Sequence, residues 1–138
     1  MYPPDLVKPM AEELVSAGFT ALHSADQVDS AVKNNEGTHL LVVNSVCGCA
    51  AGSMRPGVLL SLESDASPQS LTTVFAGVDT EATNRARQYM LPYPPSSPSI
   101  ALFKDGKLMH MVERHHIEGN SAETIAEHLK SVYKEFQN

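Results

Sequence analysis

The sequence predicts an α/β fold in which helices flank a central mixed β-sheet, and three observations support this prediction. Segments with apolar residues at helical spacing alternate along the chain with short runs rich in β-branched residues. The most apolar run, residues 40–43, is continuous, as expected for a strand buried on both faces of a sheet. Asp105-Gly106 joins two later runs, and such a pair supplies the two positive-φ residues of a tight hairpin turn. We therefore expect crossover connections and a hairpin in the same sheet.

The first part of the chain is expected to form a helix, a short strand and a second helix. Residues 5–17 place apolar side chains on one helical stripe, and Gly18 stands where a C-terminal cap belongs. Residues 19–23 form a candidate strand. Ser24 and Gln27 match a capping box at the start of the second helix. These elements lead into the central strand.

The second part of the chain alternates in the same way and ends with a helix. The expected elements are a helix at about 50–63, a strand at 71–76, a helix capped by Asp79, hairpin strands at 100–103 and 108–112, and a helix from about Asn120. Pro56 lies inside the first of these helices and predicts a bend near Arg55. Glu123 is placed for a capping box at the last helix. Residues 113–119 are expected to be a charged connector.

A proline-dense segment, residues 92–99, leads directly into the first hairpin strand. Composition alone predicts a stiff surface loop. A cis Ser97-Pro98 bond would instead let the preceding backbone present N–H and C=O groups to a bound peptide or thiol. We predict that this bond is cis and that Pro98 faces the cysteines described next.

Both cysteines of the protein, Cys47 and Cys49, follow the central strand and precede a helix. In open α/β sheets the carboxyl ends of the strands are where sites are usually built. The unpaired N–H groups of a helix amino terminus favour a thiolate over a thiol. We therefore expect the pKa of Cys47 to lie well below its usual value and Cys49 to be less reactive.

The spacing of one residue limits how the two cysteines can pair. Side chains at i and i+2 approach disulfide distance only in a compact turn, for which Gly48 supplies backbone freedom. The resulting bond would be strained, and strained disulfides are the ones most easily made and broken. Two alternatives remain open at this stage. The cysteines are either merely buried, which is common for this residue type, or they are ligands of zinc or an iron-sulfur cluster.

The composition fits one domain covering residues 1–138. The 16 acidic and 10 basic residues give a net charge of -6 without a Lys/Arg cluster, which argues against nucleic acid and anionic membranes as partners. The amino-terminal residues resemble no signal peptide, and no apolar run approaches the ~20 residues of a membrane span. We expect a cytoplasmic protein, in which a cysteine pair is catalytic or redox-sensing rather than structural.

The predicted order of elements is that of a thioredoxin-like fold. It contains a strand, a helix that follows the cysteines, a crossover to a second strand, a proline-initiated hairpin and a closing helix. The cysteines occupy the redox position of that order. Element order and cysteine position therefore predict the same fold.

Motifs along nearly the whole chain also resemble one known family. They are Gly37-Thr38, residues 42–52, Arg55-Pro56, residues 74–77, residues 95–99, and Arg114-His115 with residues 117–119. The family is the bacilliredoxins, thioredoxin-like proteins with a Cys-Gly-Cys site. His116 stands where the family usually has an acidic residue, which changes the local charge beside Arg114.

The resemblance implies a thiol-disulfide oxidoreductase that removes bacillithiol from S-bacillithiolated client proteins, with weak disulfide isomerase activity. Bacillithiol, the glutathione counterpart of some bacteria, is then a low-molecular-weight thiol co-substrate, and no bound cofactor or metal is expected. By position, Cys47 is the attacking thiolate and Cys49 the resolving thiol. The candidate substrate contacts are Gly48, Ser97, Pro98 and Arg114.

Two rival functions use the same residues. One is a general thioredoxin-like oxidoreductase or isomerase without bacillithiol specificity. The other is a carrier that binds Cu(I) or zinc through both thiolates.

The roles of the remaining polar residues stay open. Arg55 either favours the thiolate or is merely exposed, and Arg114 with His115 either steers an anionic thiol or belongs to a solvated connector. The other histidines expected at the surface are His23, His39 and His128.

Overall fold

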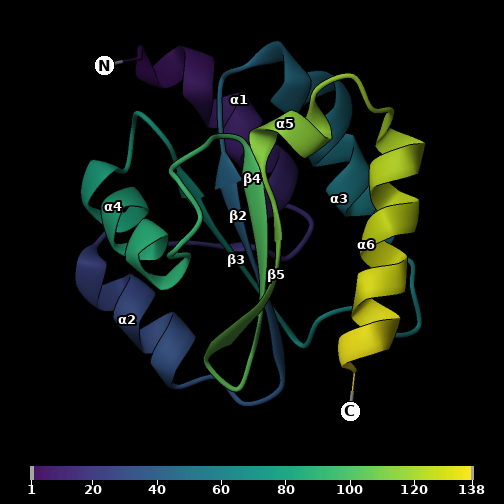
Figure 1. Ribbon diagram of the computed structural model, residues 1–138. Coiled ribbons are helices and arrows are strands. Elements are labelled where there is room, and N and C mark those ends of the chain that lie inside the picture. The colour runs from purple at the N-terminus through teal and green to yellow at the C-terminus, as the bar shows by residue number, and fades with distance from the viewer. Residues whose placement is uncertain (1, 138) are drawn as a thin grey trace.

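The computed structural model describes residues 2–137, and its centre is a five-stranded mixed sheet in the order β1-β3-β2-β4-β5 (Figure 1). The strands are β1 (Thr20–Ala21), β2 (Thr38–Asn44), β3 (Ser70–Phe75), β4 (Ser99–Lys104) and β5 (Lys107–Val112). The first three strands are mutually parallel, and β4 is antiparallel to both β2 and β5. The predicted mixed sheet, with its crossovers and its hairpin, is confirmed.

Helices cover both faces of the sheet (Figure 1). They are α1 (Pro4–Val15), α2 (Ala25–Lys33), the π-helical turn η1 (Ala50–Met54), α3 (Arg55–Ser61), α4 (Thr80–Tyr89), α5 (Arg114–Ile117) and α6 (Ala122–Phe136). Buried side chains of α2 and α4 belong to one core, whereas those of α1, α3 and α6 belong to the other. Within residues 2–137, none of the helices combines the length and the apolar character that crossing a membrane requires.

The central strand β2 joins the two cores because all seven of its residues are buried. Successive side chains of a strand point to opposite faces. Leu40 and Val42 accordingly pack with α3 and α6, and Leu41 and Val43 pack with α2 and α4. Full burial of each such side chain contributes about 1.5–3 kcal/mol. The carboxyl end of β2, where the cysteines follow, is therefore held from both sides.

The start of α2 matches the expected cap only in part. The Ser24 hydroxyl accepts the Gln27 N–H at 3.2 Å, as predicted. The Gln27 side chain, however, accepts the N–H of His23 instead of completing the capping box. Asp79 does stand at the N-cap of α4, but its carboxylate lies 2.9 Å from Nδ1 of His23 and makes no capping bond.

The carboxyl-terminal part differs from expectation at two places. The N-cap of α6 is Ser121, whose hydroxyl accepts the Thr124 N–H at 3.1 Å, so the predicted Asn120–Glu123 capping box is wrong by one residue. The expected connector at 113–119 contains a single helical turn, α5. The buried side chains of α6 include Ile125, Leu129 and Val132, and Phe136 is partly buried.

At Arg55, where a bend was predicted, the helix after the cysteines changes from π-helical to α-helical. The Arg55 N–H donates to the Ala50 carbonyl, a bond from residue i+5 to residue i that is typical of a π-helix. The regular α-helix begins at Arg55, with Pro56 in its first turn, where a missing N–H costs little. The wider π-helical turn is thus followed directly by the narrower turns of the α-helix.

His39 is buried, and the prediction of a surface position is wrong. Its side chain is on β2 and packs beside Phe103 of β4, with the ring centroids 5.7 Å apart. Nε2 bonds to the Thr72 hydroxyl at 2.6 Å, and Nδ1 is buried without a partner. Burial lowers the pKa of His39 to about 4. His23 and His128 are exposed, as predicted.

We predict that His39 makes the fold sensitive to acid. Its pKa in the folded protein lies below the ordinary value of about 6.5, so the unfolded chain takes up the proton first. Stability is full above about pH 6.5 and falls as the pH drops towards about 4. Between about pH 7.5 and about pH 5, the native protein should lose about 2 kcal/mol more than His39→Gln in urea unfolding.

His23→Gln is the matched control, since this exposed histidine should leave the acid-dependent loss unchanged. An equal loss in the native protein and in His39→Gln would contradict the prediction.

Candidate active site

Cys47 is the last residue before the helix that follows β2. The strand ends at Asn44, and Gly48 and Cys49 are already helical. The Cys47 carbonyl accepts the N–H groups of Ala50 and Ala51 at 3.0 and 3.3 Å. The predicted position at a junction of strand and helix is confirmed.

The two thiols are free and have opposite electrostatic surroundings. The Cys49 N–H donates to Sγ of Cys47 at 3.3 Å. The pKa of Cys47 is lowered mainly by the hydrogen bond from the Cys49 side chain. The backbone N–H groups of Cys49 and Ala50 and the charge of Arg114 lower it further, whereas burial opposes the shift. Burial first, and then the neighbouring Cys47, raises the pKa of Cys49. The pair therefore favours a thiolate at Cys47 and a neutral thiol at Cys49.

Arg114, the first residue of α5, joins Cys47 to the proline-dense loop. Its Nη2 donates to Sγ of Cys47 at 3.3 Å, and its Nη1 donates to the Ser97 carbonyl at 3.2 Å. Nε donates to the carboxylate of Glu118. The guanidinium side chain is 45% exposed. This cation is therefore fixed at the sulfur and is still accessible to an approaching anion.

The Ser97-Pro98 bond is cis, as predicted. Pro98 is buried immediately before β4, whose Ser99 pairs with Val43 near the end of β2. The loop therefore lies at the same end of the strands as Cys47, and Arg114 bonds to both. Leu91-Pro92 is also cis, which the sequence did not lead us to expect.

Gly48 is exposed and uses no backbone conformation reserved for glycine, because its φ is not among the positive values of this chain. The expected backbone freedom is thus not used in the dithiol form. A Cβ atom at this position would meet nothing within 4 Å. Open space therefore surrounds this position between the two cysteines.

Arg55 is buried, and the alternative that it is merely exposed is wrong. The side chain is 1% exposed, with Nε at 3.1 Å from a carboxylate oxygen of Glu13 on α1. Its Nη1 donates to the Asn44 side-chain oxygen and to the Ser45 carbonyl, each at 3.0 Å. One guanidinium thus connects α1 and α3 to the end of β2.

This polar network continues to Cys47. The Asn44 side-chain oxygen accepts the Ser45 N–H at 2.9 Å, and the Ser45 hydroxyl accepts the Cys47 N–H at 3.1 Å. Sequence reasoning missed this arrangement. The available signal was two polar residues, Asn44 and Ser45, directly after an apolar strand, with an arginine in the next helix.

His115 and His116 follow Arg114 in α5 and do not contact Cys47 directly. His116 Nδ1 accepts the Glu113 N–H at 3.1 Å and so caps the short helix, while His115 is largely exposed. The spacing of Glu113 and His116 matches that of a helix cap, which was the signal for α5. His116 therefore supports the turn that presents Arg114.

The site combines free thiols at the start of a helix, a central strand before them and a cis-proline loop beside them. These features define a thioredoxin-fold thiol-disulfide oxidoreductase. Solved structures of thioredoxins share the fold. The oxidised thioredoxin of Plasmodium falciparum matches with a TM-score of 0.60 and 14% identity over 88% of this chain and 100% of that protein. Mitochondrial thioredoxin 3 of Saccharomyces cerevisiae matches with a TM-score of 0.58 and 17% identity over 89% and 98%.

Sequence relatives identify the family. Residues 2–137 match the family model described as "Disulphide isomerase". A bacilliredoxin of Cytophaga hutchinsonii is 62% identical over 135 residues, 98% of this chain and 99% of that protein. A bacilliredoxin of Bacillus cereus is 53% identical over 131 residues, 95% of this chain and 90% of that protein. The chain belongs to the bacilliredoxin family.

We predict that iodoacetamide labels Cys47 before Cys49 at mildly acidic pH, because the thiolate is the reactive form. Arg114→Gln should raise the pKa of Cys47 and slow its labelling severalfold, since a cation next to the sulfur is lost. Mass spectrometry of briefly treated protein measures both effects. Arg85→Gln, which changes an arginine paired with Asp29 elsewhere, is the control. Equal labelling of both cysteines would contradict the prediction.

We predict that Arg55 positions Cys47 as well as stabilising the fold. Arg55→Met leaves the buried Ser45 carbonyl without its donor, which should cost about 1–3 kcal/mol in urea unfolding. The pH profile of Cys47 labelling should shift as well, because the loop that carries Cys47 loses its support. Arg55→Lys should restore both properties only in part, since it lacks the planar fork.

Arg85→Met again serves as the control, because its partly exposed ion pair with Asp29 should contribute little to stability. If Arg55→Met behaved like Arg85→Met in both measurements, the network would have no positioning role.

Proposed function

We propose that this protein removes bacillithiol from S-bacillithiolated proteins in the cytoplasm, with Cys47 as the attacking thiolate and Cys49 as the resolving thiol. The main observation in support is the polarised dithiol, in which hydrogen bonds and a cation favour the thiolate at Cys47 while Cys49 stays protonated. The bacilliredoxin relatives, 48–62% identical over nearly the whole chain, support the choice of bacillithiol.

The first step is a thiol-disulfide exchange. The Cys47 thiolate attacks the bacillithiol sulfur of the mixed disulfide, and the bond between bacillithiol and the client breaks. The client leaves as a thiolate and takes a proton from solvent, while bacillithiol stays bonded to Cys47. The number of disulfides is unchanged, so this step needs no external oxidant or reductant.

The second step discharges Cys47 in one of two ways. Cys49 loses its proton and attacks Sγ of Cys47, which releases bacillithiol and leaves a Cys47–Cys49 disulfide. A second bacillithiol thiolate can attack instead, which forms bacillithiol disulfide and restores the Cys47 thiolate. The high pKa of Cys49 keeps it from competing for the client in the first step.

The remaining site residues serve approach and orientation in this proposal. Arg114 attracts an anionic thiol and, together with the Ser97-Pro98 segment, borders the space beside Cys47. Gly48 leaves the approach to the sulfurs unobstructed.

A second candidate function, general oxidoreductase or isomerase activity without thiol specificity, is favoured by the description of the matching family model as "Disulphide isomerase". This function uses the same dithiol. It differs in one respect: the rate of the reaction should not depend on which low-molecular-weight thiol the client carries.

We predict that Cys47→Ala is inactive on a bacillithiolated client and that Cys49→Ala still frees the client once. Removing Cys49 eliminates only the attack of Cys49 on Cys47 that releases bacillithiol. Cys49→Ala should therefore accumulate one bacillithiol per chain. Intact-protein mass spectrometry detects that adduct, and the free client thiol is counted in parallel.

The same client carrying glutathione distinguishes the rival functions. Removal of glutathione and bacillithiol at equal rates would support the general oxidoreductase, and failure on both clients would support a metal carrier.

A further inference from the structure

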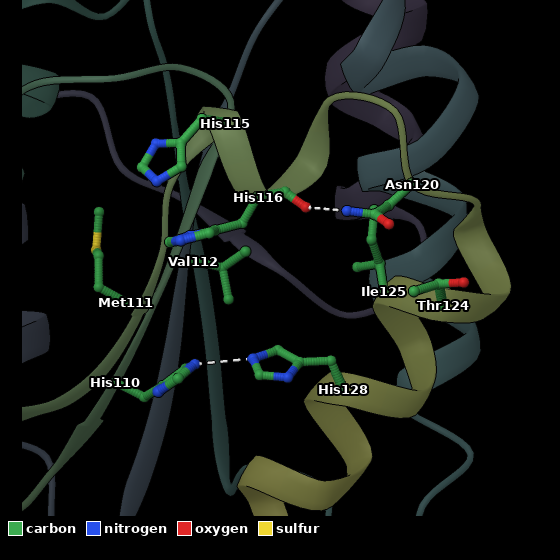
Figure 2. A pocket seen from close by; sticks show the side chains of 9 residues that line it. All are labelled: His110, Met111, Val112, His115, His116, Asn120, Thr124, Ile125 and His128. Carbon is green, nitrogen blue, oxygen red and sulfur yellow. Dashed lines mark hydrogen bonds between the residues drawn. The ribbon is translucent and has the colours of Figure 1, made fainter.

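Four of the six histidines line one cavity, and Cys47 and Cys49 are not among its lining residues. His110 comes from the edge strand β5, His115 and His116 come from α5, and His128 comes from α6 (Figure 2). The cavity has a volume of about 430 Å³. Neither the proposed exchange reaction nor the core accounts for this group of imidazoles.

Two of these side chains point directly at each other across the cavity. Nε2 of His110 lies 2.9 Å from Nε2 of His128 (Figure 2), so one nitrogen donates a proton that the other accepts. The two histidines are 18 positions apart in sequence. His110 is opposite Leu102 in the β4–β5 pair, on the face covered by α6.

We propose that His110 and His128 together bind a divalent transition-metal ion of the zinc, nickel or copper class. Imidazole nitrogens are preferred ligands of these ions. A tetrahedral ion at about 2.0–2.1 Å from each nitrogen separates the two nitrogens by roughly 3.3–3.4 Å. The observed pair needs to open by only about half an ångström to take the ion.

The protonation of the pair is compatible with metal binding. The Nε2 atom that accepts in this pair already carries a free lone pair, so only the donating ring has to change. For the ion to bind both rings, the donating ring gives its Nε2 proton to solvent and takes one up on Nδ1, so that each neutral ring presents an Nε2 lone pair and keeps one proton on Nδ1. Glu135, whose carboxylate acts on His110, offsets part of the added positive charge. Water in the cavity completes the coordination.

The other possible ligand group in this region is less suited to the role. Ligand atoms of Glu113, His115 and His116 lie within 4.8 Å of one another. Nδ1 of His116, however, already accepts the Glu113 N–H that caps α5. His115 is 69% exposed and lies 4.0 Å from Glu113. The two-histidine pair is therefore the assigned site.

The proposal is tested by titration with Ni²⁺. Because the cysteine thiolates also bind this ion, the thiolate site has to be removed before the histidine site is measured. The full chain with Cys47→Ser and Cys49→Ser serves as the background for every variant. It should bind one Ni²⁺ per chain by calorimetry and gain about 5–10 °C in Tm at a hundredfold excess over Kd. His110→Gln and His128→Gln should each weaken binding on the order of a hundredfold, since the chelate is lost.

His23→Gln is the control and should leave binding unchanged, because His23 pairs with Asp79 instead. Circular dichroism confirms that each variant is folded. With native cysteines and without metal, His128→Gln should keep full thiol-disulfide exchange, so this test is independent of the proposed function. The proposal is overturned if the background protein binds no Ni²⁺, or if His115→Gln abolishes binding while His128→Gln does not.

Discussion

Burial of β2 on both faces is the constraint on which the rest of the structure depends. A strand whose seven residues are all buried cannot shift its register by one position without exchanging the two cores. Its carboxyl end is therefore fixed relative to α3 and α6 on one side and to α2 and α4 on the other. Cys47 is held in place by this strand because only Ser45 and Val46 separate it from Asn44.

Two arginines with different surroundings act on the same residue. Arg55 is buried and holds the backbone between β2 and Cys47 through the Ser45 carbonyl and the Asn44 side chain. Arg114 is half-exposed and touches the Cys47 sulfur itself. The buried cation determines where the thiol lies, and the exposed cation influences its charge and its access to anions. Lysine could replace neither one fully, because both use more than one guanidinium nitrogen.

The single turn α5 connects two regions of the molecule. Its first residue bonds to Cys47 and to the proline loop, and its next two residues line the histidine cavity. The turn is short, so it depends on the His116 cap and on burial of Ile117 rather than on helix propensity. A change in the histidine cavity and a change at the dithiol therefore both affect the four residues of α5.

The sequence by itself determined the order of elements, the mixed sheet and the place of the Cys-Gly-Cys segment. Hydrophobic periodicity, the Asp105-Gly106 turn and the motifs around the cysteines are local properties, and each is visible over a few residues. The cis Ser97-Pro98 bond was also predicted, because the order of elements placed a proline before the hairpin.

Only the tertiary structure decided how residues distant in sequence meet. The burial of Arg55 depends on Glu13 from α1, and the contact between Arg114 and Cys47 spans 67 positions. His39 looked like a surface residue, yet its pairing with Thr72 and its packing on Phe103 bury it in the sheet. The His110–His128 pair likewise forms because α6 packs over the edge strand. Such contacts depend on the packing of whole elements, which no local pattern specifies.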